Sequence, residues 1–159
     1  MGAWTGFFET SAAASATLVG LLVVAISINI SRILGFASLP DRAASALIPL
    51  AGVLVVCLLA LVPQPTWAFA GEVLVTGVAI WAQTGRLLFR WFRNTEGVRL
   101  QWVLFHIPLN QVQTVPFIVA GVLLALGFPS GLYWIVPGVI ASLLAGLLNT
   151  WVLLVEILR

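Results

Sequence analysis

The sequence predicts an all-α membrane protein built as a bundle of five transmembrane helices, and three observations predict it. The chain of 159 residues is 62% hydrophobic and 8% charged, which leaves too few charged side chains to cover a soluble fold. Its apolar residues form five stretches of about 20 residues or more, the length that crosses a bilayer. Its basic residues are all arginine and gather at alternate connections between these stretches. We therefore expect a single transmembrane domain over residues 1–159.

Short connections with turn-forming residues separate the five stretches. Gly, Pro, Asn, Asp and Ser recur in them, as in GFASLPD, PQPT, NTEG and GFPSG. Because short connections join neighbouring elements, sequential helices should be antiparallel neighbours. The predicted spans cover residues 7–34, 42–62, 67–91, 99–126 and 130–158.

The arginines predict the orientation of the bundle. Arg32 and Arg42 flank the first connection, four more lie around the third, and Arg159 ends the chain, whereas the second and fourth connections have none. Cytoplasmic loops of membrane proteins are enriched in Arg and Lys. The N-terminus should therefore lie outside and the C-terminus in the cytoplasm, which requires an odd number of spans.

The first two spans differ in their polar side chains. No basic segment precedes the first span, and its small-residue run SAAASA comes before the apolar core, so we expect a retained helix and not a cleaved signal peptide. Small or polar residues on two of its faces favour a central position in the bundle. The second span has few polar residues, and we expect it to be peripheral and to face lipid.

The third helix has polar residues along its full length. At about 100° per residue, Glu72, Thr76, Gln83, Arg86 and Arg90 fall on one side. Polar side chains are costly in hydrocarbon, so this side should face the interior of the bundle. The arginines near its cytoplasmic end either anchor the helix at the interface or contact an anionic lipid headgroup or an acidic partner. They are Arg86, Arg90, Arg93 and Arg99.

The fourth and fifth helices complete a predicted polar interior. His106, Asn110 and Gln113 share one side of the fourth helix, and a track of small residues on the fifth includes Asn149. These groups either line a hydrated path for a ligand or ion or join the helices by interhelical hydrogen bonds. The members of the predicted interior are Asn29, Glu72, Thr76, Gln83, His106, Asn110, Gln113 and Asn149.

The sequence offers little catalytic or metal-binding chemistry. Cys57 is the single cysteine and His106 the single histidine, and no spacing typical of a metal site occurs, so we expect no metal and no cofactor. His106 either bonds a neighbouring amide or takes part in pH sensing or proton movement. No nucleophile with its base and no phosphate-binding loop is found, so we do not expect an enzyme, and we expect no nucleic-acid partner.

Two segments resemble a group of small bacterial multi-pass integral membrane proteins. They are GLLVVAISINISRIL followed by LPDRAA, and GLYWIVPGVIASLLAGLLNTWVLLVEILR. Some similar sequences are labelled as modulators of a membrane-bound AAA protease. The resemblance implies a location in the bacterial plasma (inner) membrane, and it carries over no functional residue.

Two functions are compatible with these features. The first is a non-enzymatic membrane subunit or modulator that acts through helix packing and its arginine-rich cytoplasmic face. Its partners would be membrane lipids with anionic headgroups, further copies of the chain, or another membrane protein. The alternative is a small ion channel or carrier whose polar path is lined by the first, third, fourth and fifth helices. The scarcity of reactive groups favours the first function.

Overall fold

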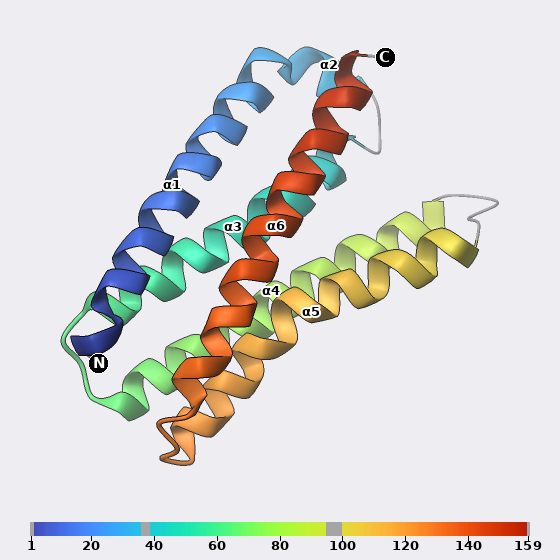
Figure 1. Ribbon diagram of the computed structural model, residues 1–159. Helices are drawn as coiled ribbons and strands as arrows, with labels where there is room; N and C mark the ends of the chain where they lie inside the picture. The colour runs from blue at the N-terminus through green and yellow to red at the C-terminus, as the bar shows by residue number, and fades with distance from the viewer. Residues whose placement is uncertain (1, 36–38, 95–99, 159) are drawn as a thin grey trace. The chain divides into compact units, whose positions relative to one another are not determined.

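The computed structural model describes residues 2–35, 39–94 and 100–158, and all regular structure in these ranges is helical (Figure 1). The side chains of Arg42, Leu88, 90–94, 100–110, 152–154 and 156–158 lie outside the description. A short 3-10 turn, η1, covers Gly2–Trp4. The α-helices are α1 (Thr5–Ile28), α2 (Ile30–Leu34), α3 (Leu39–Leu61), α4 (Thr66–Asn94), α5 (Leu100–Ala125) and α6 (Gly131–Leu158).

The helices fall where the apolar stretches predict them, within a few residues at each end. Three helical segments in the described part of the chain are long and apolar enough to cross a bilayer, namely Gly2–Ile28, Leu39–Leu61 and Gly131–Trp151. The all-helical prediction is confirmed, and these segments are compatible with a membrane protein.

The first predicted span is not one unbroken helix, because the helix breaks at Asn29. The Asn29 side-chain Nδ2 donates a hydrogen bond of 2.9 Å to the Ala25 carbonyl. In a regular helix this carbonyl would accept the hydrogen bond of the Asn29 backbone N–H. Its backbone N–H bonds instead to the Ile26 carbonyl at 3.2 Å. The chain then resumes as α2 with a bond from the Ile33 N–H to the Asn29 carbonyl. The predicted span of residues 7–34 is therefore divided between α1 and α2.

The chain divides into two compact units, one of residues 1–61 and 142–159 and one of residues 62–141. In the first unit α1 packs on α3, and in the second α4 packs on α5 (Figure 1). The boundary falls within α6, so its beginning belongs to the second unit and its larger part to the first.

The core of the first unit is centred on α3. Leu39, Ala43, Ala46 and Leu50 of this helix are buried together with Leu22 and Ile33. The Ser15 hydroxyl donates across the α1–α3 interface to the Leu50 carbonyl at 2.6 Å. Small residues let α3 approach its neighbours in this unit, although no polar residue marks that face. A peripheral place of the second span in the whole bundle stays a prediction.

Gly146 of α6 lies against the Leu50 side chain in the same unit. A Cβ atom at Gly146 would come within 2.6 Å of the Leu50 side-chain carbons. The small-residue track predicted on the last span therefore does bring the backbone of α6 close to a neighbouring helix.

The second unit depends on glycines at the α4–α5 contact. A Cβ atom at Gly121 would lie 2.8 Å from the Leu74 backbone nitrogen, and one at Gly77 would lie 3.1 Å from the Phe117 Cβ. Phe117 is fully buried, and its ring also lies against Gly138 at the start of α6. The two helices are thus in direct backbone contact, which leaves no space for a water path between them at this level.

The turn between α5 and α6 requires glycine at Gly127. This residue has a φ of 84°, a region that residues with a Cβ rarely adopt. The Gly127 N–H bonds to the Leu124 carbonyl, and the Phe128 N–H bonds to the Leu123 carbonyl at 2.9 Å, so both carbonyls at the end of α5 are satisfied. The helical hairpin can therefore turn within a few residues.

Candidate polar interior and arginine surface

Helix α4 presents three different faces. Its buried face is mainly apolar and consists of Phe69, Ala70, Val73, Gly77, Ile80 and Thr84. The residues predicted to line the interior form a second face, the polar stripe, defined by Glu72, Thr76, Gln83 and Arg86. At about 100° per residue, the polar stripe is centred about 110° from the buried face. An exposed apolar face that includes Trp67, Val75 and Val78 occupies the remaining surface.

The N-terminal half of the polar stripe is only partly buried. Glu72 and Thr76 have intermediate exposure. The Glu72 Oε2 accepts a hydrogen bond of 2.7 Å from the Gln64 Nε2, in the connection that precedes α4. Gln64 is not a predicted member of the interior, because it lies before α4 and outside the helical spacing of the polar stripe. This bond ties the α3–α4 connection to the first turns of α4.

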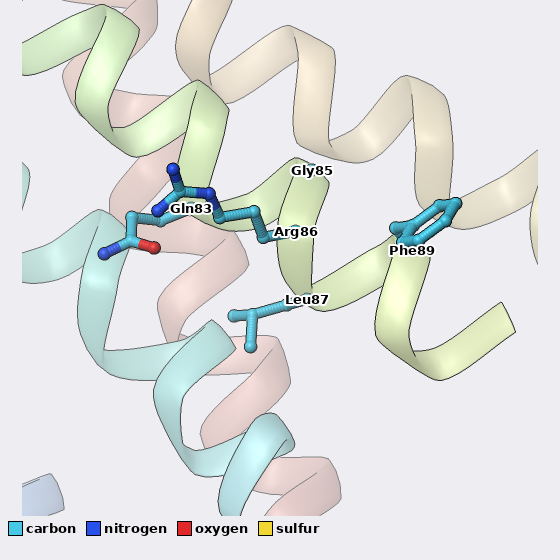
Figure 2. Close-up of a pocket in the computed structure, with 5 residues that line it drawn as sticks. All are labelled: Gln83, Gly85, Arg86, Leu87 and Phe89. Carbon is cyan, nitrogen blue, oxygen red and sulfur yellow. The ribbon is translucent and has the colours of Figure 1, made fainter. Parts of the chain in front are cut away.

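The C-terminal half of the polar stripe is exposed. Gln83 and Arg86 line an open hollow of about 520 Å³ together with Gly85, Leu87 and Phe89. Figure 2 shows the Arg86 guanidinium beside the Gln83 side chain, with Leu87 on the same side of α4 and Phe89 directed away from them. All five of these described residues belong to α4, and the hollow that they line is open.

Among the members of the predicted interior whose side chains are described, Gln113 is the most deeply buried. It is 1% exposed, as is its neighbour Thr114, and it lies on α5 one turn before Phe117. Asn29 and Asn149 are partly buried. These last two residues belong to the first unit, whereas Glu72, Thr76, Gln83 and Gln113 belong to the second. A single polar layer shared by all of them stays a prediction.

Several predicted residues lie outside the described side chains. His106, Asn110, Arg90 and Arg93 lie in helices whose side chains are not described there, and Arg99 lies outside the described residues altogether. Among the residues that the structure describes, no three His, Cys, Asp or Glu side chains come together in a way that could hold a metal ion.

Several hydroxyl groups of the described residues bond back to their own helix. Thr10, Thr17, Ser27 and Thr150 each donate to the carbonyl four residues earlier, at 2.7 or 2.8 Å. Thr84 does the same with Ile80. Ser15 instead bonds to another helix. A polar residue in these helices therefore does not by itself mark the inward face, because a local carbonyl can satisfy it.

No family model, curated protein or solved structure matches this chain. The likeness to small bacterial membrane proteins and to modulators of a membrane protease stays a prediction.

Proposed function

We propose that the chain is a five-span integral membrane protein of a bacterial plasma membrane that acts without catalysis, as a subunit or modulator of a membrane complex. The proposed orientation puts the N-terminus outside and the C-terminus inside, following the arginine distribution. The lengths of α4 and α5 support five spans. At about 1.5 Å per residue, 29 and 26 residues extend for about 43 and 39 Å, more than the hydrocarbon core of about 30 Å.

The observation that carries the proposed function is the free small-residue face of α1. The buried residues of α1 are Phe8, Ser11, Ala12, Ser15 and Leu22, which lie on one side. The opposite side is exposed and carries Gly6, Ala13, Ala16 and Gly20. A Cβ atom at Gly6 or Gly20 would meet nothing within 4 Å.

A face of this kind suits another transmembrane helix better than lipid. Helices in membranes associate where small residues let their backbones approach, and Ala16 and Gly20 have the four-residue spacing of such contacts. The described contacts within the chain use the other side of α1. We therefore expect a helix of another protein, or of a second copy, to pack on Ala13, Ala16 and Gly20.

Site-specific photocrosslinking in native membranes tests the proposal. A photoreactive amino acid at Ala16 or Gly20 should give one discrete protein adduct, whose mass shows whether the partner is a second copy or another chain. The matched control position is Leu148, an exposed residue of α6, which should give lipid adducts only. Gly20→Leu should remove an adduct formed from position 16. Lipid adducts alone at all three positions would refute packing through α1.

A flux assay separates this proposal from the channel or carrier alternative. The purified chain in liposomes should conduct no ion, and Glu72→Gln and His106→Ala should leave the background leak unchanged. A selective flux that Glu72→Gln abolishes would instead support the alternative.

A further inference from the structure

The hollow on α4 has the composition of a site for a lipid headgroup. Its polar side has a guanidinium from Arg86 and an amide from Gln83, three residues earlier on α4 (Figure 2). Its apolar part comes from Leu87, on the same side of α4, whereas the Phe89 ring, which is 66% exposed, is directed away from the two donors. None of the described residues that line the hollow is acidic. We propose that it binds the phosphate of an anionic phospholipid, with Arg86 and Gln83 as donors and the nearby apolar surface in contact with the lipid chains.

The chemistry of the two donors fits a phosphate diester. A guanidinium is always charged and can give two parallel N–H bonds to phosphate oxygens. The Gln83 amide adds N–H donors without adding charge. Gln83 is exposed and lies three residues before Arg86 on α4, and its predicted part in lining a path or joining helices stays a prediction.

The length of α4 places the hollow at the depth of lipid phosphates. This step rests on the proposed function, in which α4 crosses the bilayer. Trp67 is 74% exposed at the start of the helix, as expected of a residue at the outer interface. Arg86 lies 19 positions later, or about 28 Å along the axis, close to the thickness of the hydrocarbon core of about 30 Å. The guanidinium therefore reaches the inner headgroup layer, where anionic lipids are concentrated.

Arg32 provides a matched control within the same chain. It is exposed and lies in α2, beside the first connection, which the arginine distribution also assigns to the cytoplasmic side. Replacing Arg32 removes one positive charge from the same side of the protein without touching the hollow. A diffuse attraction to anionic lipid should weaken equally in both variants, whereas a site should weaken only when Arg86 is replaced.

Native mass spectrometry of the purified full chain in detergent tests the site. The wild type should bind phosphatidylglycerol at least tenfold more tightly than phosphatidylcholine. Arg86→Gln should raise the dissociation constant of the first bound phosphatidylglycerol at least fivefold, and Gln83→Leu should raise it two- to threefold. Arg32→Gln should change this constant by less than twofold, and no variant should alter the binding of phosphatidylcholine. Circular dichroism should show unchanged helix content, since Gln83, Arg86 and Arg32 are exposed.

Two results would overturn the site, namely no preference for phosphatidylglycerol in the wild type, or equal losses in Arg86→Gln and Arg32→Gln. Displacement of the bound lipid by glycerol 3-phosphate would also contradict it, because a soluble phosphate makes no use of the apolar surface. The binding measurement in detergent does not depend on a partner helix or on the number of spans. Failure of the lipid site is thus distinguishable from failure of the packing proposal, which the crosslinks from α1 report.

Discussion

Replacing Gly121 with alanine should separate α4 from α5. The added Cβ would lie 2.8 Å from both the Leu74 Cβ and its backbone nitrogen, and 2.9 Å from its Cα. Ordinary contact begins at 3.4 Å, so the helices must move apart by about 0.6 Å at this point. The atoms in the way belong to the backbone and to Cβ, which no change of rotamer can move.

The energetic cost follows from this geometry. A gap of 0.5–1 Å forfeits about a quarter to a half of the dispersion energy at each affected contact, and overpacked sites in proteins typically lose about 1–3 kcal/mol. The nearby contact of Gly77 with Phe117, already at 3.1 Å from an added Cβ, loosens in the same movement. Alanine has a higher helix propensity than glycine by up to about 1 kcal/mol, which offsets part of the loss. We expect a net destabilisation of about 1–2 kcal/mol, or about 5- to 30-fold in the unfolding equilibrium.

Gly71→Ala is the matched control. Gly71 is an exposed glycine of α4, and an added Cβ there would meet nothing within 4 Å. This variant should be neutral or more stable by up to about 1 kcal/mol. Reversible unfolding in mixed dodecylmaltoside and SDS micelles, followed by circular dichroism, measures both variants. If Gly121→Ala is as stable as Gly71→Ala, the close backbone contact of α4 and α5 is absent in the protein.

Two further predictions concern the first unit. Ser15→Ala removes a buried hydrogen bond to the Leu50 carbonyl and should lower the free energy of unfolding by about 0.6–1.7 kcal/mol in the same assay. Thr17→Ala removes only a bond within α1 and should lower it by less. Equal effects of the two variants would contradict the interhelical role of Ser15. Asn29→Leu removes the side-chain donor to the Ala25 carbonyl and should join α1 and α2 into one helix. The Cα chemical shifts of the variant in micelles should then be helical without interruption from α1 to α2. An interruption of the helix that persists at residue 29 would show that the Asn29 side chain does not cause it.

The positions of the helices were predictable because they depend on chain composition alone. In a bilayer, the backbone N–H and C=O groups of a stretch of about 20 apolar residues must form hydrogen bonds within the stretch, and an α-helix forms all of them. The turn at Gly127 also follows a signal visible in the sequence, a glycine just beyond the last apolar residues of a helix.

The packed faces were less predictable, because polarity is a poor guide to them here. The α3 face that contains Ala43, Ala46 and Leu50 is buried through the fit of its side chains, and nothing polar marks it. On α1, Ser15 faces a neighbouring helix whereas Ser27 is exposed and satisfied by the Val23 carbonyl. Both serines look alike in the sequence, since the difference depends on which carbonyl each hydroxyl reaches.

The candidate sites show the same limit. The polar stripe of α4 was found from its spacing, and its residues do fall on one side of the helix. Its direction toward the interior of the bundle was predicted from the cost of polar groups in hydrocarbon and stays a prediction, and Gln83 and Arg86 are exposed. Long side chains near a helix end can reach the interface, which removes the need to turn inward. Pairs such as Gln64 with Glu72 depend on how a connection folds back, which periodicity does not encode.

Cysteine accessibility tests the central claim, a five-span membrane protein with its arginines on the cytoplasmic side. In a Cys57→Ala background, single cysteines replace Leu34, Thr66, Asn94 and Ser130, which lie next to the four successive connections. In intact cells, a membrane-impermeant maleimide should label positions 66 and 130, and it should reach positions 34 and 94 only after lysis. Labelling of position 94 together with 66 and 130 would contradict the account, since α4 and α5 would then not cross the bilayer.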